Sequence, residues 1–271
     1  MRAQLNILSL VSLRKTAVKA LRVFVRPEGR RKRKLSALFE AGEALSFRLN
    51  GHSVRGRRWK PSLEVGRRVL IAHGFGASSA AFEPYVSALL KKGCEVVAFD
   101  APGHGRSGGK RLFITDYVRM LTQIEQSYGP FQSWLGHSLG GLALALSLED
   151  SVSDGRSRLA LVAPAPELAA AVEEWAGMMQ LPAAVVREID EYVRVTSGHP
   201  LAWYGLRRAI GSIGAEILYV QDEGDAVVAP DTARVIEGDG HRNIQFLFTT
   251  GLGHRKVYKD PDVMERIVDF L

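Results

Sequence analysis

Ser138 stands between two glycines in the sequence Gly-His-Ser-Leu-Gly of residues 136–140. An apolar run before it predicts a strand, and the run LGGLALALSLED behind it predicts a helix. A turn that joins a strand to a helix within so few residues strains the serine backbone, and flanking glycines let the two elements pass closely. The pattern predicts that Ser138 is an exposed nucleophile, from which His137 points away.

A nucleophilic serine needs a neighbouring base, because its hydroxyl keeps its proton at neutral pH. The chain has seven histidines, and their places relative to the predicted strands separate them. His254 follows the last predicted strand and should lie at the same sheet edge as Ser138, whereas His241 precedes that strand. His73 and His104 occupy earlier loops, where they could line a pocket. We therefore predict that His254 is the base.

A carboxylate must orient the imidazole and stabilise its charged form. Three candidates follow the penultimate predicted strand, namely Asp222, Glu223 and Asp225. Asp222 is close to the strand end and could serve only to cap the turn. Asp225 lies beyond Gly224, where the loop can swing toward His254. Asp225 is the preferred acid, and Asp222 is the alternative.

The tetrahedral intermediate of acyl transfer also needs donors for its oxyanion. The stretch HGFGASS of residues 73–79 follows a predicted strand directly, and its glycines allow backbone amides to face a cleft. We expect the N–H groups of Phe75 and Leu139 to be the two donors.

Strands and helices alternate through most of the chain, which predicts a parallel sheet covered on both faces. The ends of parallel strands share one edge, where reactive groups collect. A hairpin is predicted over residues 44–59, before the first of these strands. The later predicted strands are residues 67–74, 94–100, 132–138, 158–164, 216–222 and 244–251.

Residues 165–212 are helix-like throughout, without a predicted strand. A single crossover of ~48 residues is long, because compact connections are short. We interpret this stretch as a helical lid inserted in the sheet domain; ordinary crossover helices are the alternative.

The basic residues are concentrated in an N-terminal arm, residues 1–35, which holds 11 of the 36 Lys and Arg and one of the 29 acidic residues. The rest of the chain therefore carries slightly more acidic than basic side chains, which argues against a general attraction for phosphates. Val11, Val18, Leu21 and Val25 recur at helical spacing, which predicts an amphipathic helix with a basic face. Two roles stay open for the arm: binding an anionic membrane surface, or docking on the body of the protein.

Other partners and locations are less favoured. The basic run RRKRK of residues 30–34 has no recognised nucleic-acid-binding module beside it, so no nucleic-acid partner is expected. The longest apolar stretch of the arm, residues 5–13, is about half the ~20 residues of a membrane span. It also lacks a convincing signal-peptide pattern. We expect a cytoplasmic protein, peripheral at the membrane if the arm binds lipid.

Five motifs occur in an order that resembles the α/β-hydrolase fold serine hydrolases, a group that includes esterases, lipases and lysophospholipases: HGFG, FDAPGHGRSGG, GHSLGG, QDEGDAVVAP and GLGH. The resemblance covers about residues 67–271. It implies an α/β-hydrolase fold, with a mostly parallel eight-stranded sheet flanked by helices and a helical lid, within a domain of residues 36–271. It also implies that no metal and no organic cofactor is used.

The resemblance further implies that Ser138, Asp225 and His254 form a catalytic triad, and that Phe75 and Leu139 form the oxyanion hole. The expected reaction is hydrolysis of a small-molecule carboxylic ester through an acyl-enzyme intermediate. Thioesterase, lysophospholipase or carbon–carbon bond hydrolase chemistry would use the same residues. The alternative from another class is a catalytically silent protein that binds a membrane surface through the arm.

Overall fold

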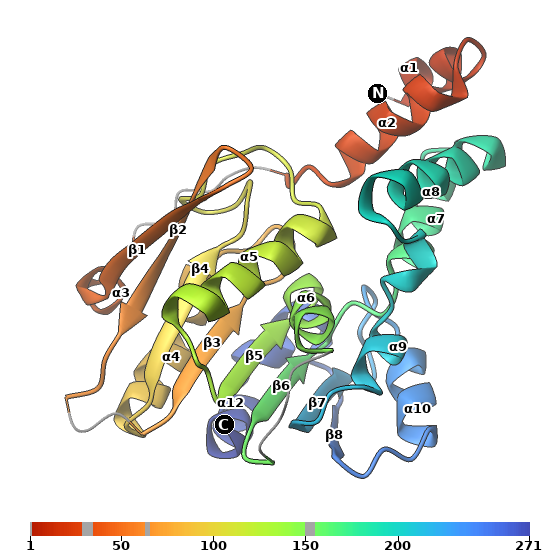
Figure 1. Cartoon of the computed structure of the whole chain (residues 1–271). Helices are drawn as coiled ribbons and strands as arrows, with labels where there is room; N and C mark the ends of the chain where they lie inside the picture. The colour runs from red at the N-terminus through yellow and green to blue at the C-terminus, as the bar shows by residue number, and fades with distance from the viewer. Residues whose placement is uncertain (1, 29–34, 63–65, 150–154) are drawn as a thin grey trace.

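One eight-stranded sheet forms the centre of the computed structural model, which describes residues 2–28, 35–62, 66–149 and 155–271 (Figure 1). The strand order is β1-β2-β4-β3-β5-β6-β7-β8. The pairs β1–β2 and β2–β4 are antiparallel, and all other pairs are parallel. The predicted hairpin and mostly parallel sheet are therefore confirmed. The strands are β1 Glu43–Leu49, β2 His52–Trp59, β3 Arg68–Ala72, β4 Glu95–Asp100, β5 Ser133–His137, β6 Arg158–Val162, β7 Glu216–Asp222 and β8 Ile244–Thr249.

The insertion between β6 and β7 divides into two parts. α7 (Leu168–Met178) and α8 (Ala183–Ser197) stand away from the sheet (Figure 1). α9 (Leu206–Ile210) packs against α6 (Leu139–Leu148) and belongs to the main core. The helical character predicted for this stretch is confirmed, but its last helix covers the sheet and does not project with α7 and α8.

The N-terminal arm forms two helices, α1 (Arg2–Ser9) and α2 (Leu13–Phe24), where the sequence predicted one. Ser12 interrupts the helix and caps α2, since its Oγ accepts a hydrogen bond from the N–H of Lys15. Val11, one of the apolar residues that predicted a single helix, is 79% exposed in this break. The basic run of residues 30–34 lies outside the described residues.

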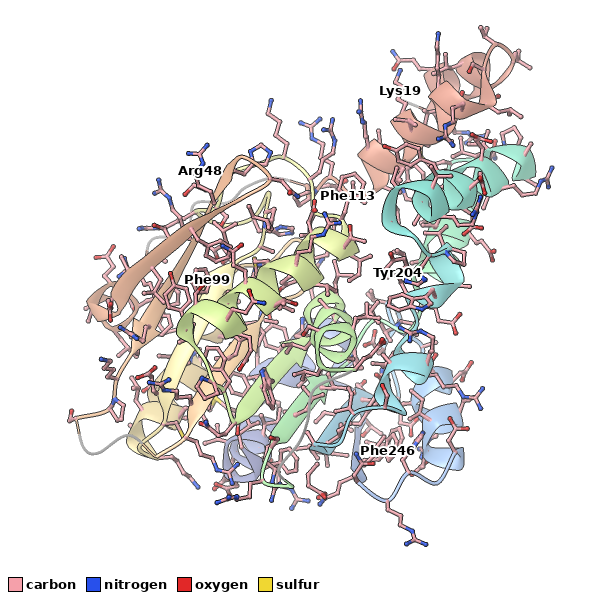
Figure 2. The ribbon with its side chains drawn as sticks, viewed as in Figure 1. Lys19, Arg48, Phe99, Phe113, Tyr204 and Phe246 are labelled. Carbon is pink, nitrogen blue, oxygen red and sulfur yellow. The ribbon has the colours of Figure 1, made fainter. Side chains whose placement is uncertain are left out.

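The arm packs on the insertion and also touches the body. A separate apolar cluster joins Ala17, Ala20 and Leu21 of α2 to Val185 and Ile189 of α8. Close to the end of α2, the carbonyl of Val25 accepts a hydrogen bond of 2.9 Å from the N–H of Leu112. Phe113, which packs against the same cluster, lies between α5 and the arm (Figure 2). The arm thus connects α8 to the loop that precedes α5.

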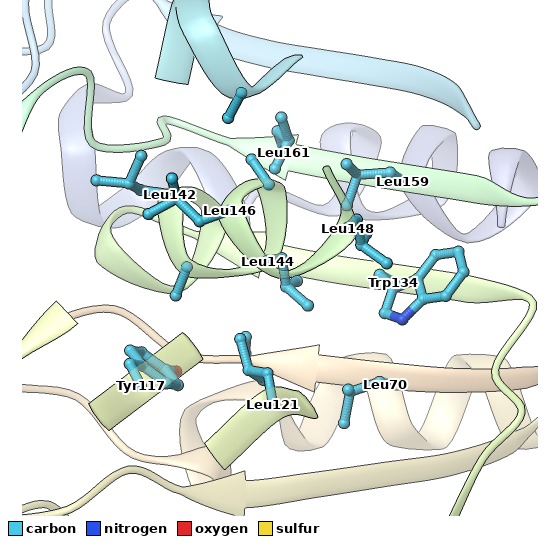
Figure 3. Close-up of a cluster of buried hydrophobic side chains, with 14 of the residues drawn as sticks. Leu70, Tyr117, Leu121, Trp134, Leu142, Leu144, Leu146, Leu148, Leu159 and Leu161 are labelled. Atoms are coloured by element: carbon cyan, nitrogen blue, oxygen red, sulfur yellow. The ribbon is translucent and has the colours of Figure 1, made fainter. Parts of the chain in front are cut away.

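Helices cover both faces of the sheet. The larger cluster lies under α5 (Ile114–Tyr128), α6, α9 and α10 (Asp231–Gly238), and Figure 3 shows its leucine-rich centre. The other lies under α3 (Ala37–Ala41), α4 (Glu83–Lys91) and α12 (Pro261–Phe270). All residues of β4 and β5 are buried, as expected of central strands covered on both sides. Among the described residues, no helix has the length and apolar character needed to cross a membrane.

Candidate active site

The turn between β5 and α6 holds Ser138 in an unusual backbone conformation. Its φ is 51° and its ψ is −124°, a left-handed region that costs a non-glycine residue ~1–3 kcal/mol. Neighbouring segments fix it there: the Ser138 N–H donates to the carbonyl of Val162 at 3.1 Å, and its carbonyl accepts from the N–H of Ala165 at 3.0 Å. The strained turn that the sequence predicted is thus present, and the surrounding backbone stabilises it.

The glycines on either side of Ser138 are needed because the chain passes itself closely. A Cβ on Gly136 would lie 2.6 Å from the Cα of Gly141. A Cβ on Gly140 would lie 2.4 Å from the carbonyl oxygen of Ala72. Both separations are far below van der Waals contact, so α6 can start this close to β3 and β5 only with glycine at these positions.

Three side chains from distant parts of the chain form one hydrogen-bonded line. His254 lies in the short helix α11 (Gly253–Lys256), and its Nε2 is 3.1 Å from the Oγ of Ser138. Its Nδ1 is 2.8 Å from Oδ2 of Asp225. With a neutral imidazole, Nδ1–H donates to the carboxylate and Nε2 accepts from the hydroxyl. The structure therefore brings together the three residues that the sequence predicted as a triad.

Asp225 is held rigidly by the loop after β7. Its Oδ1 accepts hydrogen bonds from the N–H groups of Val227 at 2.8 Å and Val228 at 2.9 Å. Its other oxygen faces His254, and the side chain is fully buried. A buried carboxylate fixed by these donors can orient an imidazole and stabilise its protonated form.

Asp222, the alternative acid, has a different environment. Its Oδ1 accepts from the N–H of Gly224 at 3.0 Å, and its Oδ2 accepts from Thr249 Oγ1 at 2.8 Å and the N–H of Leu252 at 3.0 Å. Burial acts to raise the pKa of Asp222, but hydrogen bonds, the largest from the N–H of Gly253, bring it below its ordinary value. Asp222 therefore ties the loops after β7 and β8 together, and its hydrogen bonds in the described structure do not include His254.

The two expected oxyanion donors lie on opposite sides of Ser138 in the sequence, and both have unused N–H groups. Leu139 is the first residue of α6, where a backbone N–H has no partner within the helix. Phe75 lies in the loop after β3. Within the described ranges, no hydrogen bond uses the N–H of either residue. Both groups are free to donate to a ligand.

His73 and His104 support the loop of Phe75. Nε2 of His104 accepts a hydrogen bond of 2.9 Å from the N–H of Gly76. Nε2 of His73 accepts one of 2.9 Å from the N–H of Ala101, and burial lowers the pKa of His73. Both histidines are buried and support these loops through the hydrogen bonds above, whereas the sequence suggested only that they could line a pocket. The sequence feature that could have indicated this supporting role is that the two histidines follow two different strands.

His137 contacts the proposed base directly, a relation the sequence did not predict. Its Nε2–H donates a hydrogen bond of 3.0 Å to the backbone carbonyl of His254. Its ring centroid lies 4.8 Å from that of His254 and 4.3 Å from that of Tyr258. Burial, reinforced by the nearby His254, lowers the pKa of His137 to about 3. A neutral His137 thus packs against and supports the helix that carries His254.

This low pKa predicts a loss of stability in mild acid. Between pH 6.5 and about 3 the unfolded chain binds a proton at His137 and the folded chain does not. The free energy of unfolding that neutral His137 contributes is complete above pH 6.5. It declines as pH falls, by at most ~1.4 kcal/mol per pH unit. We expect His137→Gln to reduce the pH dependence of the unfolding free energy between pH 7.5 and 4.5, measured by urea denaturation. The exposed His52→Gln is the matched control, and an unchanged slope in His137→Gln would contradict the assignment.

Comparison with known protein families identifies the family of the chain's central segment. A sequence model of the family described as "Serine aminopeptidase, S33" matches residues 64–203, just over half of the 271 residues. The matched segment contains Ser138 and Phe75, whereas Asp225 and His254 lie beyond it.

Curated relatives match over shorter segments. Human monoglyceride lipase is 29% identical over 99 residues, which are 34% of this chain and 33% of that protein. Monoacylglycerol lipase of Mycolicibacterium smegmatis is 34% identical over 91 residues, 31% of this chain and 32% of that protein. A pimeloyl-[acyl-carrier protein] methyl ester esterase of Aliivibrio salmonicida is 30% identical over 158 residues, 58% of this chain and 57% of that protein. The matches thus span from about a third to somewhat over half of these relatives.

Solved structures are similar over most of the chain. An esterase of Pyrococcus furiosus has a TM-score of 0.64 at 18% identity and covers 91% of this chain and 97% of its own. A monoacylglycerol lipase of Paleococcus ferrophilus has a TM-score of 0.59 at 20% identity and covers 80% of this chain and 99% of its own. At these identities the likeness shows a shared fold.

Proposed function

Because the chain belongs to the S33 family of α/β-hydrolase fold serine hydrolases and is an esterase- or lipase-like enzyme, we propose that it hydrolyses a small-molecule carboxylic ester through an acyl-enzyme on Ser138. The observation that carries this proposal is the hydrogen-bonded line from Asp225 through His254 to Ser138. This line also argues against a catalytically silent protein, because it keeps a hydroxyl, an imidazole and a carboxylate within hydrogen-bond distance of one another.

The proposed mechanism follows from the roles that this geometry allows. His254 Nε2 takes the proton of Ser138 as Oγ attacks the ester carbonyl, while the N–H groups of Phe75 and Leu139 stabilise the oxyanion. His254 then donates that proton to the departing alcohol. The same imidazole then takes a proton from a water molecule as the water attacks the acyl-enzyme, and it returns that proton to Ser138 Oγ as the acid departs. Asp225 stabilises the imidazolium that forms in each step.

Exposed apolar side chains in the loops that carry the proposed oxyanion donor and the proposed acid favour an ester with an apolar part. Phe75 is 41% exposed in the loop after β3, and Val227 is 67% exposed in the loop that fixes Asp225. The names of these three curated relatives describe ester hydrolases, which favours an ester over a thioester or a carbon–carbon bond. We further propose that α7 and α8, within the insertion of residues 165–212, act as the lid of the domain of residues 36–271.

Labelling with a fluorophosphonate tests the activated serine. We expect one adduct per protein molecule, located on the tryptic peptide that contains Ser138, because only an activated hydroxyl in an open site reacts with this electrophile. The Ser138→Ala variant should remain unlabelled. A folded wild-type protein without an adduct, or with its adduct on another serine, would contradict the proposal. Rates with p-nitrophenyl esters of increasing acyl length would then define the preferred acyl group.

We also propose that the enzyme works in the cytoplasm and binds anionic membrane surfaces through residues 1–35, as a peripheral protein. The turn between α1 and α2 exposes Leu10, which is 87% exposed, together with Val11 and Leu13. Lys15 and Lys19 follow on α2, and Lys19 is labelled on the arm in Figure 2. Apolar side chains at a helix turn flanked by lysines suit insertion among anionic headgroups.

Vesicle co-sedimentation tests the membrane proposal with the full chain, because removing the arm would uncover the apolar face of α8. Each lysine near an anionic surface contributes ~1 kcal/mol, so Lys15→Gln/Lys19→Gln should weaken binding to phosphatidylserine-containing vesicles by about 30-fold. The control Lys60→Gln/Lys91→Gln removes two exposed lysines of the body. Equal binding by the two double variants would reject the role of the arm.

A further inference from the structure

A cavity lies beside the β1–β2 hairpin, away from the triad. It has a volume of about 210 Å³ and is bounded by β1, β2, α3 and the loops that follow β3 and β4. No residue of the predicted triad lines it. In the β1–β2 pair, Ala44 lies opposite Arg57 and Ser46 lies opposite Arg55, so these four side chains share one face. Because Ala44 and Ser46 are small, they leave space beside the arginines.

Three arginines line this cavity without an acidic partner. They are Arg55 and Arg57 of β2 and Arg106 of the loop after β4. Nη1 of Arg57 donates to two backbone carbonyls, of Glu40 and Gly42, which do not neutralise its charge. In the part of the chain that the structure describes, none of the three guanidinium groups forms an ion pair within 4 Å of a carboxylate.

The carboxylate that lines the cavity, Asp100, is occupied by other donors. Oδ1 of Asp100 accepts from the N–H and the hydroxyl of Ser79, at 2.9 and 2.7 Å. Its Oδ2 accepts from the backbone N–H of Arg106 at 2.8 Å and packs against Gly105, where a Cβ would lie 2.1 Å away. Asp100 is also nearly fully buried. Three arginines therefore share the cavity lining with one carboxylate whose hydrogen-bonding capacity is largely used.

We propose that this cavity binds a phosphate monoester or inorganic phosphate. The guanidinium fork matches phosphate oxygens in two parallel hydrogen bonds, and a dianion would neutralise the excess of two positive charges. The volume is far above the ~15 Å³ that one water molecule needs, so a small polyatomic anion fits. Ser79 begins the short helix that follows the loop of Phe75, so the bound anion would lie beyond the end of the proposed oxyanion loop and not in it. The proposal does not depend on the proposed hydrolysis.

Calorimetric titration of the full chain with sodium phosphate, at constant ionic strength in a sulfonate buffer, tests the site. We expect saturable binding that Arg55→Gln/Arg106→Gln weakens at least tenfold. The control Arg48→Gln changes an exposed arginine near the turn of the same hairpin, outside the cavity (Figure 2), and should bind as the wild type does. Ser138→Ala should also bind normally, which separates this proposal from the catalytic one.

A second titration distinguishes the source of the phosphate group. Dihexanoyl phosphatidic acid, kept below its micelle concentration, presents the same monoester on a lipid. If inorganic phosphate binds and the double arginine variant weakens that binding, the ligand is a soluble phosphate. If only the lipid binds in a way that the double variant weakens, the ligand is a lipid headgroup. Absence of saturable binding in both titrations, or an equal loss in Arg48→Gln, would overturn the proposal.

Discussion

The substitution Ser138→Ala is expected to lower turnover of a p-nitrophenyl ester by about 10⁴- to 10⁶-fold, because no acyl-enzyme can form without the attacking oxygen. The residual rate would come from oxyanion stabilisation and substrate binding alone. Ser138 Oγ makes its side-chain contact with His254 at 3.1 Å, so the loss of one oxygen should leave the fold intact. Initial rates at saturating substrate, with circular dichroism of both proteins, measure the effect.

A matched serine nearby controls this experiment. Ser78 lies in the loop after β3, close to Phe75 in the chain, and its side chain makes no capping hydrogen bond to the short helix that follows. Ser78→Ala should retain turnover within a few-fold of the wild type. A folded Ser138→Ala variant that keeps more than a tenth of the wild-type rate would show that another group is the nucleophile.

The second large effect is expected from Asp225→Asn, which should lower turnover by about 10³- to 10⁴-fold. An amide can still accept the hydrogen bonds of Val227 and Val228, so the loop should persist. The uncharged amide does not stabilise an imidazolium, and it can present its NH₂ to Nδ1 and favour the wrong tautomer of His254. Rates and unfolding free energies of the purified variant test this expectation.

Asp222→Asn provides the comparison, because the two carboxylates are three residues apart and both are buried. Asp222 accepts hydrogen bonds that join the loops after β7 and β8. Its replacement should lower the unfolding free energy by ~1–3 kcal/mol while the folded fraction keeps most of its turnover. If Asp222→Asn instead lost as much turnover as Asp225→Asn, the assignment of the acid to Asp225 would fail.

The N-terminal arm packs directly on α7 and α8, the helices of the proposed lid. Nη1 of Arg14 in α2 forms a 3.0 Å ion pair with Glu188 of α8, and the ring of Phe24 lies 5.5 Å from that of Trp175 in α7. Val25 then reaches the body through its bond with Leu112. If α7 and α8 moved over the sheet edge, the arm would therefore have to move with them or lose these contacts. Any membrane contact of the arm is thus linked to the position of the proposed lid.

Local sequence patterns determined that the chain forms a sheet, in what succession strands and helices follow along the chain, and where the turn at Ser138 lies. These features depend on residues close together in the chain: apolar runs fit strands buried on both faces, and glycines fit a turn where the backbone passes itself. The choice of His254 and Asp225 also followed from sequence, because parallel strands bring every loop that follows a strand to one edge. The two residues could be placed at that edge without knowledge of any distance.

Only the tertiary structure decided which distant groups meet. The sequence could not separate Asp222 from Asp225 by contact, because the choice depends on where Thr249 and Leu252 lie after folding. Nor could it show that His137 supports His254, that α2 packs on α8, or that Arg55 and Arg106 line one cavity. Hydrogen bonding and packing join residues far apart in the chain, and their directions are fixed only when the whole core assembles.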